Sequence, residues 1–150
     1  MSLVIELSKE YLYVVLTTVL MCIELQVFGV FAGVQRKKYG GLVKYPDNGY
    51  GRWADKLNEK DWISFANYQR VHYNMLEGIT GIVLFTLVAG IFFPFYAAIF
   101  GAAYVVGRAI YAVGYWSQGA QGRTVGAIIL DVGLVANVGM ALYGLITAVL

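Results

Sequence analysis

Four long apolar stretches dominate the pattern of hydrophobic and polar positions along this chain. They lie at about 11–35, 64–93, 95–116 and 124–149. A helix that crosses a bilayer needs roughly 20 mostly apolar residues, and each stretch reaches that length. The pattern therefore predicts an all-α fold, an integral membrane four-helix bundle in which successive helices run up and down, with residues 1–150 forming a single membrane domain.

The connections between the stretches differ in length. Phe93-Pro94-Phe95 leaves room only for a tight hairpin between the second and third helices. A proline fits the start of a helix, because the N–H group it lacks has no partner there. The connection at 36–63 is the only substantial segment expected outside the membrane.

Composition narrows the class of protein. Of the 150 residues, 59% are hydrophobic and 13% are charged, whereas soluble domains are about one quarter charged. The single cysteine, Cys22, excludes an internal disulfide and a cysteine-based metal site. A net charge of +2 is too small for tracking nucleic-acid phosphates, so no nucleic-acid partner is expected.

The basic residues are distributed unevenly between the two ends of the predicted bundle. Of the 11 Lys and Arg residues, all but Lys9 fall toward the end that carries the first and third connections. The positive-inside rule makes that end cytoplasmic. We expect a multi-pass protein of the endoplasmic reticulum if the source is eukaryotic, or of the inner membrane if it is bacterial, with its active site facing the cytoplasm.

A polar stripe opens the second stretch. Arg70, Asn74 and Glu77 fall within an arc of about 60° at 100° per residue, while His72 points to nearly the opposite side. Ionisable groups inside a membrane are costly, so each is a candidate for function. The alternative is an intrahelical Arg70–Glu77 pair that only neutralises itself.

The third stretch carries a similar stripe of Arg108, Tyr111 and Tyr115. Tyrosines near a membrane surface also occur as part of an aromatic belt, which is the alternative for Tyr115. Asp131 lies at a depth comparable to Arg108, so a structural ion pair between them is the alternative for both. Glu24 lies near the middle of its stretch and receives no role.

The polar groups at this end of the bundle indicate a small zwitterionic ligand. Arginine forks suit carboxylates and a lone glutamate suits an ammonium group. Glutathione fits, since it has two carboxylates, an amine and a thiol, and an arginine or tyrosine aimed at the thiol favours the reactive thiolate. A hydrophobic co-substrate would arrive laterally from the lipid. The only histidine has no partners at metal-ligand spacing, so no metal is expected.

Three motifs carry a family resemblance that covers nearly the whole chain. They are Arg70-x-His72-x-Asn74-x-x-Glu77, Arg36-Lys37-Lys38-Tyr39, and the run from Val106 to Tyr115. The sequence resembles the membrane-associated proteins in eicosanoid and glutathione metabolism, the MAPEG family. Within that family it looks most like the microsomal glutathione transferases of the third type.

The resemblance implies a homotrimer of four-helix subunits with glutathione at each subunit interface. It gives Arg123 the role of stabilising the thiolate, with Tyr115 as the alternative catalytic residue. At Gly78 the chain departs from leukotriene C synthase, which has a tyrosine there that would supply a further glutathione contact. The candidate glutathione-binding residues are Arg36, Arg70, His72, Asn74, Glu77, Arg108, Tyr111 and Tyr115.

The function expected from these observations is a membrane glutathione transferase, with glutathione-dependent peroxidase activity, acting on lipophilic electrophiles or lipid hydroperoxides. One alternative is a specialised eicosanoid synthase of the leukotriene C or prostaglandin E type. Another is a noncatalytic lipid-binding scaffold that resembles the lipoxygenase-activating protein, a relative that lacks the arginine found here at Arg70.

Overall fold

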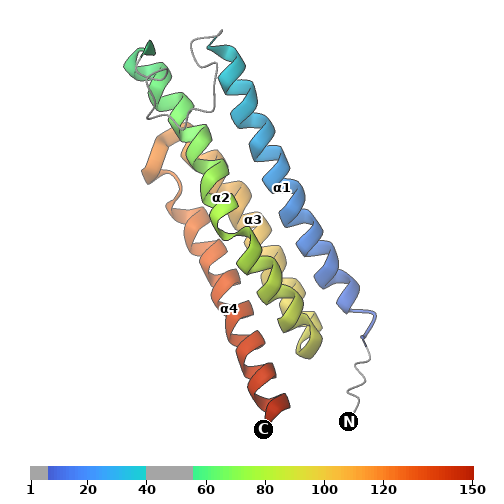
Figure 1. Cartoon of the computed structure of the whole chain (residues 1–150). Helices are drawn as coiled ribbons and strands as arrows, with labels where there is room; N and C mark the ends of the chain where they lie inside the picture. Colours follow the sequence, from blue (N-terminus) through green and yellow to red (C-terminus); the bar gives the residue numbers. More distant parts are fainter. Residues whose placement is uncertain (1–6, 40–55) are drawn as a thin grey trace.

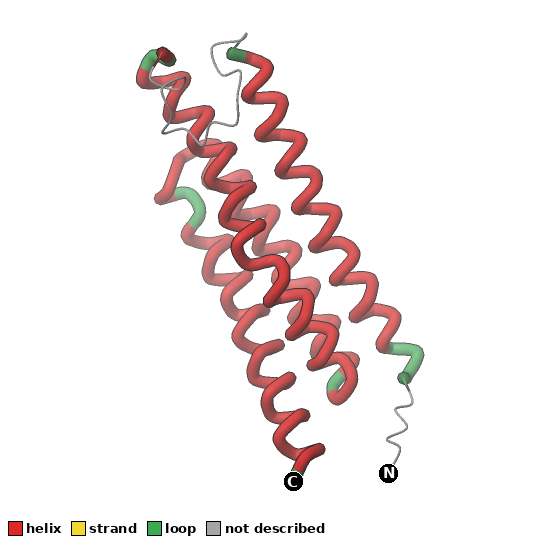
Figure 2. The backbone as a smooth tube through the Cα atoms, in the orientation of Figure 1, coloured by secondary structure: helices red, strands yellow, loops and turns green. Residues whose placement is uncertain are grey.

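A computed structural model describes residues 7–39 and 56–150 of the chain. Within this part, every regular element is helical, and four helices are long and apolar enough to cross a membrane. Figures 1 and 2 show the bundle that they form. The predicted fold class is confirmed. The elements are α1 (Tyr11–Lys38), α2 (Glu59–Phe92), α3 (Pro94–Gln118), the 3₁₀ turn η2 (Gly119–Gln121) and α4 (Thr124–Val149).

The helices alternate in direction along the bundle, so that the start of α1 and the end of α4 lie at the same end (Figure 1). Pro94 is the first residue of α3, and Phe93 alone separates it from α2. This is the tight hairpin that the sequence predicts. At the opposite end of the bundle, η2 and two further residues separate α3 from α4.

The helix α2 begins earlier than the hydrophobic pattern indicates. Asn58 caps it by accepting a hydrogen bond from the Asp61 backbone N–H at 2.9 Å, and acidic side chains in the first turn favour the positive end of the helix dipole. Residues 59–63, expected in the connection, are therefore helical. Lys44, Arg52 and most of that connection lie outside the described residues.

The outer surface of the bundle is apolar, as a membrane protein requires. Large side chains such as Leu12, Val30 and Val135 are more than half exposed. Such an apolar surface would be a liability in water and is the expected contact with lipid tails. The interior is packed by residues from different helices, with Met21 and Met75 both fully buried.

The helices α3 and α4 approach closely at two glycines. A Cβ atom added to Gly107 would lie 2.5 Å from the Leu130 backbone nitrogen, and one added to Gly126 would overlap the Tyr111 backbone. Small residues allow this approach of membrane helices. The contact fixes the first turn of α4 against Tyr111 on α3.

This packing yields a testable prediction. Gly126→Ala forces the α3 backbone to move and should lower the free energy of unfolding by about 1–3 kcal/mol, the usual cost of overpacking. The measurement is denaturant or thermal unfolding in detergent. Gly139→Ala in the same helix is the matched control, because nothing lies within 4 Å of its added Cβ. Equal stabilities of the two variants would contradict this account of the α3–α4 contact.

Candidate functional site

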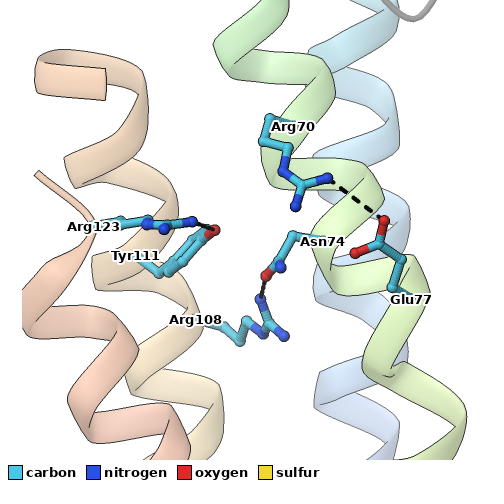
Figure 3. A network of polar contacts seen from close by, with 6 residues as sticks. All are labelled: Arg70, Asn74, Glu77, Arg108, Tyr111 and Arg123. Atoms are coloured by element: carbon cyan, nitrogen blue, oxygen red, sulfur yellow. Dashed lines mark hydrogen bonds and ion pairs between the residues drawn. The ribbon is translucent and has the colours of Figure 1, made fainter. Parts of the chain in front are cut away.

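Arg108 is the centre of a polar network that joins α3 to α2. Its side chain is only 5% exposed. Its Nε donates to the Tyr104 hydroxyl at 2.9 Å, and its Nη1 donates to Asn74 Oδ1 at 2.6 Å. Figure 3 shows the guanidinium crossing from α3 to Asn74 on α2. Hydrogen bonds to a charged donor are strong, so these contacts fix the distance and rotation of the two helices here.

Arg123 lies in the connection just before α4 and turns toward the tyrosines of α3. Its Nη1 donates to the Tyr111 hydroxyl at 3.3 Å, and its Cζ lies 5.6 Å from the centre of the Tyr115 ring. The hydrogen bond to Tyr111 raises the pKa of Arg123 above its ordinary value. The guanidinium therefore stays cationic at every physiological pH, held beside two aromatic rings.

These groups line a cavity of about 320 Å³. Arg108 and Arg123 both line it, and residues such as Ile82 and Leu130 supply apolar parts of its wall. A Cβ at Gly78 would lie 3.7 Å from Arg108 Nη2, so a larger side chain there would occupy space next to that donor. The lining residues are Asn74, Gly78, Ile82, Tyr104, Arg108, Tyr111, Arg123, Ala127, Leu130, Asp131 and Leu134. The cavity thus offers fixed cationic donors to an anionic group.

Arg70 and Tyr115 line a second cavity of about 270 Å³. Trp62 and Asn67 also line it. Because the Arg123 guanidinium contacts the Tyr115 ring, the second cavity adjoins the first through that tyrosine. The sequence predicted one pocket, whereas a single chain divides most of the candidate residues between two neighbouring cavities.

The Arg70–Glu77 pair considered from the sequence does form, at 3.6 Å between Nη1 and Oε1 (Figure 3). The two side chains remain 48% and 62% exposed. A pair this exposed contributes little to stability, because water screens the charges. The charged groups of a ligand can therefore replace Glu77 as the partner of Arg70, and Arg70 as the partner of Glu77.

Three candidate residues, Arg36, His72 and Glu77, line neither cavity. The His72 ring packs against α1, where a Cβ at Gly29 would lie 3.2 Å from Nε2. Arg36, near the end of α1, lies over the Phe65 ring at 5.8 Å. Their roles in glutathione binding remain predictions.

The alternative ion pair between Arg108 and Asp131 is not found among the described residues. Arg108 instead donates to Asn74 and Tyr104, while Asp131 is exposed at the cavity. Tyr104 was missed by the sequence reasoning. It lies four residues before Arg108, so extending the third-helix stripe by one turn would have found it.

A comparison with protein families finds a match over most of the chain. The MAPEG family model matches residues 14–146. The match begins in α1 and ends in α4, so it spans all four helices and includes every candidate site residue. The family resemblance carried by the sequence motifs is thereby confirmed.

The Arg108 network predicts a stability effect. Asn74→Ala removes the acceptor of a buried, charged donor, and we expect it to lower the free energy of unfolding by about 2 kcal/mol or more. Leu76→Ala is the matched control, because this side chain is 49% exposed on the same helix. Unfolding in detergent measures both, and an Asn74→Ala protein as stable as its control would refute the structural role of this hydrogen bond.

Proposed function

Because the chain belongs to the MAPEG family, whose members have glutathione-related and eicosanoid-type functions, we propose that this integral membrane protein is a glutathione transferase with glutathione-dependent peroxidase activity. Its substrates would be lipophilic electrophiles and lipid hydroperoxides. One observation carries the proposal: Arg108 and Arg123 line a single cavity together with Asn74 and Tyr111, at one end of a bundle whose outer face is apolar.

The charges around the two cavities suit the whole of glutathione. Arg70 and Arg108 are donors for its two carboxylates, and Glu77 is an acceptor for its ammonium group. Asn74 can bind a backbone amide of the tripeptide through its free NH₂ group. The Arg70–Glu77 pair faces outward in a single chain. This exposure supports a homotrimer in which a neighbouring subunit covers the pair and completes the site.

In the proposed reaction, Arg123 stabilises the thiolate of glutathione. A cation beside a thiol lowers the pKa of the thiol, so the proton leaves to water and the sulfur keeps the electron pair. The thiolate then forms a carbon–sulfur bond with the electrophile, and the leaving group departs with the electrons of the broken bond. The ring contacts of Tyr111 and Tyr115 hold Arg123 in place for this step.

The same thiolate supports peroxide reduction. Its sulfur attacks the outer oxygen of a lipid hydroperoxide, the O–O bond breaks, and the lipid leaves as an alcohol after taking a proton. The resulting sulfenic acid condenses with a second glutathione thiol and releases water and glutathione disulfide. Two thiols are oxidised for each hydroperoxide reduced. The lipid substrate would enter from the bilayer, and the charged end of the bundle would face the cytoplasm.

The noncatalytic scaffold is the main rival from another class of function. A scaffold should bind no glutathione, whereas the transferase should bind it in the detergent-solubilised state, and calorimetry measures the difference directly. A specialised eicosanoid synthase would also bind glutathione. It would be distinguished by substrate profiling, since it should use one lipid and reject small chlorinated nitrobenzenes.

The role of Arg123 gives a direct prediction. Arg123→Ala should lower kcat for conjugation of a chlorinated nitrobenzene by about 10²-fold or more, the usual effect of removing a group that stabilises a developing or reacting anion. Arg123→Lys keeps the charge but not the fork, so it should retain part of the activity. Peroxidase activity toward a lipid hydroperoxide should fall in parallel, since both reactions need the thiolate.

The matched control is Gln121→Ala, an exposed position two residues earlier in the same connection. It should keep wild-type kcat. Full conjugating activity in Arg123→Ala would exclude the role proposed for this arginine. A loss in both variants would instead show that the connection is sensitive to any substitution.

A further inference from the structure

Asp131 is an ionisable residue within the apolar helix α4, and the proposed chemistry gives it no role. It lies about 10 Å along the helix axis from Thr124, the first residue of α4. Its side chain is exposed, as are the apolar side chains of Ile128 and Val132 beside it. An ionisable group on the outer part of a membrane helix costs free energy, so its presence indicates a function.

The position of Asp131 connects two hollows of the molecule. With Arg108 and Arg123 it lines the first cavity. It also lines a groove of about 590 Å³ on the outer, apolar face of the bundle, which we call the α4 groove. Asp131 is therefore placed where the polar cavity and the lipid-facing groove meet. The other residues of the α4 groove are all apolar: Phe100, Ile128, Val132, Val135 and Ala136.

The carboxyl group of Asp131 is available to a substrate. No hydrogen bond or ion pair joins it to another side chain in the described part of the chain. Tyr104 and Tyr111 in the first cavity also carry transferable protons, but their hydroxyls already accept hydrogen bonds from Arg108 and Arg123. Neither tyrosine lines the α4 groove. Of the described residues, Asp131 is thus the ionisable one that lines both hollows.

Hydroperoxide reduction needs a proton at such a junction. The thiolate attacks the outer oxygen, and the inner oxygen, which stays bonded to the lipid, leaves one bond further from the sulfur. An alkoxide is a poor leaving group, so a proton donor placed at the inner oxygen accelerates the cleavage of the O–O bond. With the sulfur at Arg123 and the lipid chain in the α4 groove, the inner oxygen would lie between them, at the position of Asp131.

We propose that Asp131 donates the proton to the departing alkoxide, and that the α4 groove holds the chain of the lipid hydroperoxide. The sulfur forms its bond to the outer oxygen, and the electron pair of the O–O bond stays on the inner oxygen. That oxygen takes the proton of the Asp131 carboxyl group, so the lipid leaves as an alcohol. The carboxylate then regains a proton from water, to which the glutathione thiol has given its own. The inference rests on the proposed function and names the lipid-binding surface and the proton donor of the same site.

The test compares two reactions of one protein. Asp131→Asn keeps the size of the side chain and removes the acid. We expect kcat for a long-chain alkyl hydroperoxide to fall about 10²-fold, a usual contribution of general acid catalysis. We expect kcat for a chlorinated nitrobenzene to stay within about twofold of wild type, because chloride leaves without a proton. Asp131→Glu, which keeps the acid, should recover part of the peroxidase activity.

A change of leaving group separates proton transfer from substrate binding. A peroxy acid of similar chain length releases a carboxylate, which needs no proton. Its reduction, after subtraction of the uncatalysed rate, should therefore be insensitive to Asp131→Asn. The matched control is Leu142→Ala, an exposed position of α4 that lines neither hollow, and it should keep wild-type activity with all of these substrates.

The α4 groove is tested by filling it. Ala136→Phe places a large side chain in the groove and should raise the KM for the long-chain hydroperoxide severalfold. The KM for tert-butyl hydroperoxide, which has no chain to place there, should not change. Equal KM changes for the two peroxides, or loss of the oligomer by size-exclusion chromatography, would assign the groove to a subunit contact instead of the lipid.

Several results would overturn the role of Asp131. Wild-type peroxidase activity in Asp131→Asn would exclude it, and so would an equal loss of activity toward the hydroperoxide, the peroxy acid and the nitrobenzene. A selective peroxidase loss in Tyr104→Phe, absent from Asp131→Asn, would assign the proton to Tyr104. The failure of the proposed function is distinct. A wild-type protein that conjugates the nitrobenzene but reduces no hydroperoxide would end this inference and leave the transferase standing, whereas one that does neither would remove both.

Discussion

A guanidinium buried inside a membrane protein must find its partners within the protein, and Arg108 imposes this constraint on the whole bundle. Only 5% of it is exposed, so an unpaired donor would cost several kcal/mol. Its hydrogen bonds to Tyr104 and Asn74 therefore determine how α3 faces α2. The helices can pack in only a narrow range of rotations if all of these groups are to be satisfied.

The second determinant of the site is the close approach of α3 and α4. Because Gly107 and Gly126 carry no side chains, the two backbones touch, and the residues before α4 are carried to the tyrosines of α3. Arg123 therefore reaches Tyr111 without belonging to a regular helix. Packing through small residues and electrostatic pairing thus act together. The first sets the separation of the helices, and the second sets their rotation.

Much of this arrangement could be predicted from the sequence, because the hydrophobic pattern and the helical period are local properties. The four helices and the stripe of Arg70, Asn74 and Glu77 follow from counting residues. What could not be predicted depends on how the stripes of different helices meet. The pairing of Arg108 with Tyr104 rather than Asp131, and the division of the site into two cavities, are set by tertiary contacts.

The central claim is that Arg123 holds a glutathione thiolate, and the ultraviolet absorbance of the thiolate tests it most directly. Glutathione should be added to the detergent-solubilised wild-type and Arg123→Ala proteins at neutral pH, and the difference spectra compared at concentrations that saturate both. The account predicts a thiolate band with the wild type, well below the pH at which free glutathione ionises, and a much weaker band with the variant. Equal bands in the two proteins would contradict it.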